Sequence, residues 1–188
     1  MKPRSRLQAA LLAAVMLVTG CGYNTIQSLD ERVNQAQGQI QAQLQRRADL
    51  IPNLVNTVKG ITKQEDTIFI SIANARARLA GAVQSGNVPD MATANQELTQ
   101  GLGRLLAIAE NYPQLRSSDN FRDLQAQIEG TENRIAVARQ DYNTAVADFN
   151  SYIRRFPYNL TAKLFGMGRS RDYFEAAPGA TEVPRVEF

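Results

Sequence analysis

Apolar residues recur every three or four positions from about residue 23 onward, the spacing that places them on one face of an α-helix. The first stripe consists of Ile26, Leu29, Val33, Ala36, Ile40, Leu44, Ala48, Ile51, Val55 and Val58. Similar stripes follow in residues 61–79 and 91–109. The clearest pattern has an apolar residue at every seventh position, at Phe121, Ile128, Ile135, Tyr142, Phe149 and Phe156, as in a helical bundle seam. The pattern predicts an all-α chain.

Pro52 interrupts the first stripe. A proline inside a helix removes one hydrogen bond and crowds the preceding turn, so we expect a break or sharp kink between Ala48 and Asn53. Asp49 would then serve as the N-cap of a second helix, which would place Pro52 in its first turn and extend to about Gln84.

The remaining boundaries follow from turn residues. Asn87 is predicted to cap a third helix, with Pro89 in its first turn, and Ser118 or Asp119 to cap a fourth that extends to about residue 155. Residues 159–165 predict a short helix, 171–176 another turn, and 177–188 an extended tail. Short connections favour antiparallel neighbours, so the predicted fold is an all-α, antiparallel up-and-down four-helix bundle over residues 21–176, with long helices and a short C-terminal helical segment.

The first twenty residues resemble a secretory signal. Basic residues at positions 2, 4 and 6 precede an apolar run of about 12 residues, shorter than the roughly 20 that span a bilayer. Cys21 follows Val18-Thr19-Gly20, an order that resembles a bacterial lipobox. We therefore predict a signal peptide at residues 1–20 and lipidation of Cys21, with a thioether-linked diacylglycerol and a further acyl chain such as palmitate on the freed amine. The alternative is an uncleaved apolar anchor with an unmodified cysteine.

Lipidation would tether the protein in the cell envelope on the periplasmic, extracytoplasmic side, because two or more acyl chains anchor a protein stably. Gly22, where an aspartate would favour retention, favours the outer membrane if the organism has one. Removing residues 1–20 also leaves 18 basic and 18 acidic residues, because three of the 21 basic residues lie there. A neutral exported domain is not expected to bind nucleic acid.

The chain has no histidine and a single cysteine. Zinc sites of the usual Cys/His kinds and imidazole-dependent nucleophile relays are therefore excluded, and we predict no metal, no cofactor and no enzymatic activity. Glu129 and Glu132 lie three residues apart on a predicted helix, where such carboxylates are usually solvated.

Arg46 and Arg47 are adjacent, so a helix can direct only one of them inward. A buried arginine needs a carboxylate partner, since an unpaired buried charge is costly. Glu110 and Glu132 are the candidates, and such a pair would fix the register of two helices. The alternative is that both arginines are solvated.

Aromatic and amide residues supply the other candidates. We expect Tyr112 and Pro113 to form a loop whose ring packs on the end of the bundle, with contact to a ligand as the alternative. Tyr142 is expected in the core. Asn143 and Asn150 share one helix face and are expected to hydrogen-bond a partner helix or loop.

Five stretches together resemble the LemA family: "YNTIQSLDERVNQAQGQIQAQLQRRADLIPNLVNTVKG" at 23–60, "ARARL" at 75–79, "ENYPQL" at 110–115, "IEGTENRIAVARQDYNTAVADFN" at 128–150 and "FPYNLTAKLFGMGRSRDYF" at 156–174. The resemblance covers nearly the whole chain after Cys21. Its motifs contain the residues expected to have a structural or interaction role: Arg46, Arg47, Asp49, Pro52, Asn53, Glu110, Tyr112, Pro113, Glu132, Arg139, Tyr142, Asn143 and Asn150.

The resemblance implies an antiparallel bundle outside the cytoplasmic membrane, with no established biochemical activity. Family members usually begin with a membrane-spanning helix, where this chain has a lipobox. They are often encoded beside TPM-domain proteins or membrane metalloproteases, which suggests such envelope proteins as partners. The expected function is a non-enzymatic interaction module. A ligand-binding sensor at the bundle end near Tyr112 and an envelope hydrolase are the alternatives.

Overall fold

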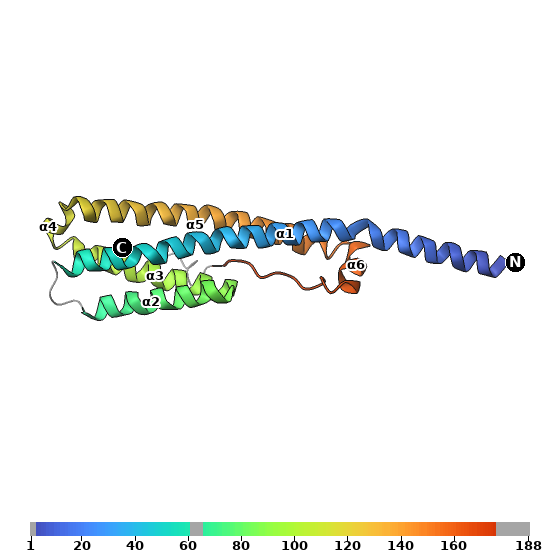
Figure 1. Ribbon diagram of the computed structural model, residues 1–188, viewed down its shortest axis with the longest axis horizontal. Coiled ribbons are helices and arrows are strands. Elements are labelled where there is room, and N and C mark those ends of the chain that lie inside the picture. Colours follow the sequence, from blue (N-terminus) through green and yellow to red (C-terminus); the bar gives the residue numbers. More distant parts are fainter. Residues whose placement is uncertain (1–2, 61–65, 176–188) are drawn as a thin grey trace, which may run out of the picture. The chain divides into compact units, whose positions relative to one another are not determined.

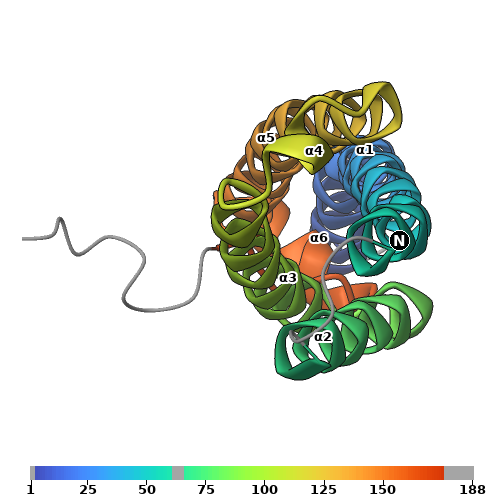
Figure 2. The ribbon, with the colours of Figure 1, turned by 90° about the vertical axis from the view of Figure 1, so that its left-hand side faces the viewer.

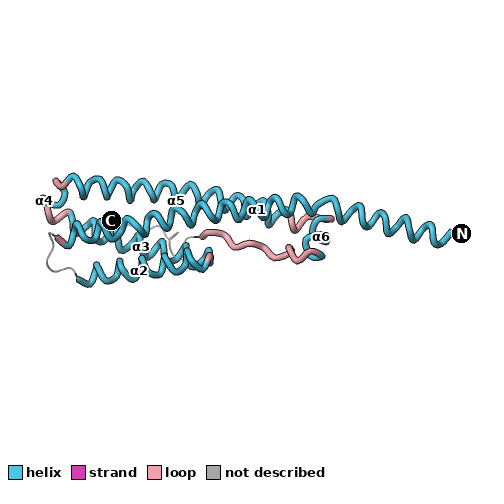
Figure 3. The backbone as a smooth tube through the Cα atoms, in the orientation of Figure 1, coloured by secondary structure: helices cyan, strands magenta, loops and turns pink. Residues whose placement is uncertain are grey.

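The structure is a computed structural model that describes residues 3–60 and 66–175. Every regular element in these two ranges is a helix, drawn cyan in Figure 3, so the all-α prediction is confirmed. The helices are α1 (Pro3–Lys59), α2 (Asp66–Ser85), α3 (Val88–Ala109), α4 (Pro113–Arg116), α5 (Asp119–Tyr152) and α6 (Tyr158–Leu164), labelled in Figure 1. The predicted tail at 177–188 lies outside the described residues.

The chain divides into two compact units. Unit 1 comprises Met1–Gln37 and Asp141–Asp172, and unit 2 comprises Gly38–Gln140 and Tyr173–Phe188. Both α1 and α5 therefore contribute residues to each unit. Within the described residues, no helix is both long enough and apolar enough to cross a membrane.

Unit 2 is built from the second part of α1, from α2 to α4 and from the first part of α5, whose ribbons are seen end-on in Figure 2. The predicted apolar stripes form its core, with Leu44, Ile51, Ile72, Leu79, Met91, Leu98, Leu105, Phe121 and Ile135 all buried. Helices α2 and α3 approach closely at Gly101, where an added Cβ would lie 3.1 Å from Ile72 Cγ1. A larger residue there would push the two helices apart.

Unit 1 combines the first part of α1, the end of α5, and α6 with the irregular segment that follows it. Ile26, Val33, Tyr142, Val146, Phe149 and Ala162 form its core. The short predicted helix at 159–165 is confirmed as α6. Phe156 is 79% exposed, however, because α5 ends at Tyr152 and the seven-residue repeat ends with Phe149. Expecting it in the buried seam was wrong.

The predicted break at Pro52 is also wrong, because α1 continues as an α-helix through Pro52 to Lys59. Proline has no N–H with which to bond the carbonyl four residues earlier, that of Ala48. Arg76 of α2 supplies the missing donor, with its Nε 2.7 Å from Ala48 O. A side chain from another helix thus satisfies the carbonyl that Pro52 leaves free. The break occurs instead between Lys59 and Asp66.

Other boundaries agree with the sequence more closely. Asn87 caps α3 by accepting a hydrogen bond from Asp90 N, and Pro89 lies in the first turn, as predicted. Helix α5 begins at Asp119. The Tyr112-Pro113 segment is a short helix, α4, rather than only a loop, with Tyr112 as its N-cap residue. Residues 171–175 form no turn, for a reason given below.

Candidate functional site

Arg47 of α1 is the largest buried polar side chain in unit 2, with 1% of it exposed. Its Nη2 forms an ion pair with Glu132 Oε1 of α5, and its Nη1 donates to Asn95 Oδ1 of α3 at 2.6 Å. The Thr99 hydroxyl of α3 donates to the same Glu132 oxygen at 3.0 Å. We call these four residues the Arg47 cluster. It joins three helices in the core of unit 2.

The adjacent arginines differ as expected: Arg47 lies on the buried face with Leu44 and Ala48, whereas Arg46 is exposed. One of them therefore pairs with one of the two candidate glutamates, as hypothesised. The other glutamate, Glu110, is an exposed residue at the C-cap of α3. Its position at a helix end explains why it does not take the partner role in the core.

Burial dominates the electrostatics of Arg47. Desolvation lowers its pKa, while the charge of Glu132 and the hydrogen bond to it act in the opposite direction. Arg47 Nε is buried and has no hydrogen-bond partner, and the same holds for Gln43 Oε1 one turn earlier on α1. The pair joins a buried arginine to a carboxylate that is 36% exposed, so it is weak evidence for net stabilisation and better evidence for a defined arrangement of helices.

In unit 1, side chains of α5 hold the backbone of the segment after α6. Asn150 accepts from Arg171 N at 2.8 Å and donates to Arg171 O at 2.9 Å, as a neighbouring strand would. The Tyr142 hydroxyl donates to Asp172 O at 2.9 Å. These bonds take up the backbone groups that the predicted turn at 171–176 would have used. That prediction was wrong for this reason.

The Arg171 side chain extends this attachment to α1. It donates to Asp30 Oδ1 from Nη2 at 2.7 Å and from Nε at 3.2 Å, and its Nη2 lies 3.4 Å from Asn34 Oδ1. Arg154 Nη2 of the chain after α5 also donates to Ser170 Oγ at 3.0 Å. We call the segment 168–172 with these contacts the strap of unit 1. The strap ties α1 to α5.

Tyr142 is buried in the core, as expected, and its hydroxyl reaches the strap. Burial raises the pKa of Tyr142; the nearby charge of Arg171 lowers it and that of Asp172 raises it. The structural role expected for Asn150 is thus a hydrogen bond to a loop. Asn143, expected on the same face, is half-buried.

The other candidates lie apart from these contacts. Asp49 is not an N-cap, because it lies within α1, where it accepts from Gln45 Nε2 at 2.9 Å. Asn53 is exposed and its carbonyl accepts from Thr57 Oγ1 at 2.9 Å. Tyr112 is half-buried, and Arg139 is exposed on α5. The Cys21 side chain lies outside the described residues.

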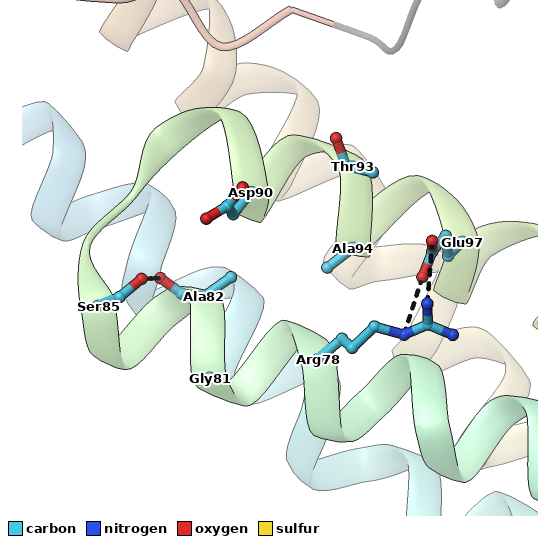
Figure 4. Close-up of a pocket in the computed structure, with 8 residues that line it drawn as sticks. All are labelled: Arg78, Gly81, Ala82, Ser85, Asp90, Thr93, Ala94 and Glu97. Atoms are coloured by element: carbon cyan, nitrogen blue, oxygen red, sulfur yellow. Dashed lines mark hydrogen bonds and ion pairs between the residues drawn. The ribbon is translucent and has the colours of Figure 1, made fainter.

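A groove of about 350 Å³ lies between α2 and α3 in unit 2 (Figure 4). Arg78 reaches from α2 to Glu97 of α3 at one end, with Nε 3.3 Å from Oε2 and Nη1 3.4 Å from Oε1. Ser85 and Asp90 lie toward the α2–α3 turn, and Gly81, Ala82, Thr93 and Ala94 complete the lining. Small residues line much of it, with charged and hydroxyl groups at its edges, and it lies away from Tyr112.

The described residues contain no group of three or more acidic or cysteine side chains placed to hold a metal ion. Sequence reasoning missed Arg76, Asn95, Thr99 and Asp30. The sequence did indicate that Arg76 lies near the core, because it belongs to the "ARARL" stretch and is one helical turn from buried positions. Nothing in the sequence linked it to a carbonyl 28 residues earlier.

A model of the LemA family matches residues 36–188, which is most of the chain. The chain belongs to the LemA family. The match covers all of the Arg47 cluster, the bond from Arg76 to the Ala48 carbonyl and the α5 side of the strap. It begins after Cys21, so it does not bear on the predicted lipobox.

Similar proteins include three described as magnetosome proteins. MamQ 2 and MamQ 1 of Paramagnetospirillum magneticum are each 28% identical over 186 residues, which covers 86% of this chain and 68% of each relative. MamQ of Magnetospirillum gryphiswaldense is 25% identical over 204 residues, covering 94% of this chain and 74% of the relative.

Proposed function

We propose that this LemA-family protein is a non-enzymatic, lipid-tethered interaction module of the cell envelope. The observation that carries the proposal is how its buried polar side chains are used. Arg47, Tyr142 and Asn150 each bond to groups on other elements of the chain, across helices or to the strap. Chemistry-bearing groups engaged in this way hold helices in register, which suits a scaffold more than a catalyst.

The proposed scaffold has an antiparallel up-and-down four-helix bundle in unit 2. Short connections favour this topology, since α2 and α3 are separated only by Gly86 and Asn87. The contacts within the unit support it as well. Arg47 connects α1 with α5, Thr99 connects α3 with α5, and Arg76 connects α2 with α1.

Anchoring through lipid on Cys21 is the second part of the proposal. Mass spectrometry of the protein taken from its native membrane should show Cys21 as an acylated N-terminal residue, and Cys21→Ser should move the protein out of the membrane fraction. A native chain that keeps its initial methionine and carries no lipid would refute the anchor.

A test of Gly22, the residue after the cysteine, needs a matched control variant, because a Cβ at Gly22 would lie 2.5 Å from Tyr158 Cδ1. The membrane in which the Gly22→Asp protein is found should therefore be compared with that of the Gly22→Ala protein. Gly22→Ala introduces the same crowding against Tyr158 without the charge.

The relatives bear on where the protein acts. The MamQ proteins are described as magnetosome proteins, which associates them with a cellular structure. By analogy we propose that this chain also serves a cellular structure, here the envelope. Its partners would be other envelope proteins, such as a TPM-domain protein or a membrane metalloprotease.

The α2–α3 groove is the proposed contact for such a partner. Gly81 lines it and has open space where a side chain would project, so Gly81→Phe should fill the groove without disturbing the core. Gly103→Phe is the matched control, because Gly103 is an exposed α3 glycine that also has open space around it. Cross-linking of the acylated protein in membranes should recover an envelope protein that Gly81→Phe loses and Gly103→Phe retains. Equal recovery with both variants would refute the groove as the contact.

A ligand-binding sensor is the second candidate, now at this groove and not at Tyr112. The ion pair of Arg78 and Glu97, with the hydroxyls of Ser85 and Thr93, offers polar groups to a small molecule. Native mass spectrometry would support the sensor if it detected a small-molecule adduct that Gly81→Phe removes. An adduct retained by that variant, or a protein without one, would refute it.

A further inference from the structure

We propose that α6 and the residues flanking it form a second membrane contact. This region lies on an anionic lipid surface and inserts its apolar side chains into the bilayer beside the lipid anchor. The proposal rests on the proposed anchoring at Cys21. All of its residues belong to unit 1. We call the apolar part, Phe156, Leu160, Leu164 and Phe165, the α6 patch.

The α6 patch collects large apolar side chains that face water. Phe156 is 79% exposed, Leu160 52%, Leu164 70% and Phe165 50%. Leu160 and Leu164 are four residues apart on the same face of α6, whereas Thr161 and Ala162 on its other side are buried. Single exposed apolar residues are normal, but four large ones within ten consecutive residues, two of them on one helix face, indicate an interaction surface.

The charges around the patch favour lipid as its occupant. The chain from residue 149 to residue 171 contains five basic residues and no acidic residue. Arg171 is paired with Asp30, while Arg154, Arg155, Lys163 and Arg169 are exposed and lie in the same stretch of chain as the apolar side chains. Basic residues at an apolar surface attract anionic headgroups. A second copy of the chain would instead bring like charges together across the contact.

The position of α6 places the patch next to the anchor. The ring of Tyr158, the first residue of α6, lies against the backbone of Gly22, which leaves no room for a side chain there. The ring of Phe165 contacts that of Tyr23, with centroids 4.7 Å apart. Helix α6 thus packs on the turn of α1 that directly follows Cys21, as Figure 1 shows for these two elements. Lipid chains on Cys21 would enter the bilayer beside the patch, and combined signals hold a protein more firmly than one.

Tryptophan fluorescence offers a site-specific test, because the chain has no tryptophan. Full-length acylated protein carrying Leu164→Trp would be reconstituted into vesicles of phosphatidylglycerol and phosphatidylcholine, with and without bromine on the acyl chains. Ile70→Trp is the matched control, since Ile70 is 60% exposed on α2. The brominated lipid should quench the probe of Leu164→Trp and leave that of Ile70→Trp unchanged. Quenching should weaken in vesicles of phosphatidylcholine alone.

The outcomes separate this proposal from the anchor. A chain that carries lipid on Cys21 and sediments with vesicles, yet shows no quenching in Leu164→Trp, would overturn the α6 contact and leave the anchor intact. Quenching in a chain with unmodified Cys21 would support the contact and refute the anchor. A blue shift of the Leu164→Trp probe that needs no lipid and grows with protein concentration would identify a second copy as the occupant, and would overturn the proposal.

Discussion

Removal of the Arg76 guanidinium should destabilise the protein because it leaves a buried carbonyl without a donor. Helix α1 passes through Pro52, so the Ala48 carbonyl has no intrahelical partner and accepts from Arg76 Nε at 2.7 Å. Ala48 is buried, which keeps water from replacing the lost bond. Leaving a buried carbonyl unsatisfied costs about 1–3 kcal/mol. Arg76→Met removes the donor and keeps an apolar stem, so we expect a loss in this range.

Pro52→Ala provides the second half of the test. Alanine restores an N–H that can donate to the Ala48 carbonyl, so Arg76→Met should then cost less than about 0.5 kcal/mol. Urea unfolding of the wild-type protein, Arg76→Met, Pro52→Ala and the double variant, followed by far-ultraviolet circular dichroism, would give the four free energies of unfolding. With a urea dependence of about 1–3 kcal/mol per molar, the predicted loss shifts the midpoint by roughly 1 M.

Arg78→Met is the matched control for this cycle. Arg78 lies two residues further along α2 and forms an exposed ion pair with Glu97, so its loss should change stability by no more than about 1 kcal/mol. The reasoning is refuted if Arg76→Met costs the same with proline and with alanine at position 52. It is also refuted if the Arg76 and Arg78 variants are equally destabilised.

Three further results are expected. Arg47→Met should lower the free energy of unfolding by about 1–3 kcal/mol because it leaves the partly exposed Glu132 and the Asn95 side-chain oxygen without their donor, and adding Glu132→Leu should recover part of the loss; urea unfolding measures both. Because burial raises the pKa of Tyr142, the folded state holds the phenol proton more tightly than the unfolded state. The free energy of unfolding should therefore fall as the pH rises above about 10. Tyr142→Phe should reduce this pH dependence in unfolding curves recorded across that range. Gly22→Ala should lower the melting temperature, and combining it with Tyr158→Ala should remove the clash, so that the two changes together cost less than the sum of each alone.

The first and third of these predictions each have a matched control variant. Arg46→Met changes an exposed neighbour of Arg47 and should alter stability by no more than about 0.5 kcal/mol. Gly38→Ala introduces a methyl group into open space on α1 and should be neutral or stabilising. A large loss from Arg46→Met, an unchanged pH dependence in Tyr142→Phe, or strict additivity of the Gly22 and Tyr158 changes would each contradict the corresponding argument.

The sequence by itself determined that the chain is helical, most of the buried helix faces and several helix ends. Apolar periodicity depends on the geometry of a single helix, so the stripes through Leu44, Leu98 and Ile135 could be assigned without a partner in view. The Asn87 cap is equally local, since its bond reaches only to Asp90. The angle between successive helical residues likewise shows that at most one of the two adjacent arginines can face inward.

Only the tertiary structure decided what those faces meet. Arg47 pairs with Glu132 and not Glu110 because of which helix lies opposite it in the core. Helix α1 survives Pro52 because Arg76 arrives from another helix, and residues 171–172 avoid a turn because Tyr142 and Asn150 bind their backbone. In each case a backbone or charged group is satisfied by a partner far along the chain. Local propensity carries no information about such a partner, because packing of separate helices brings it into reach.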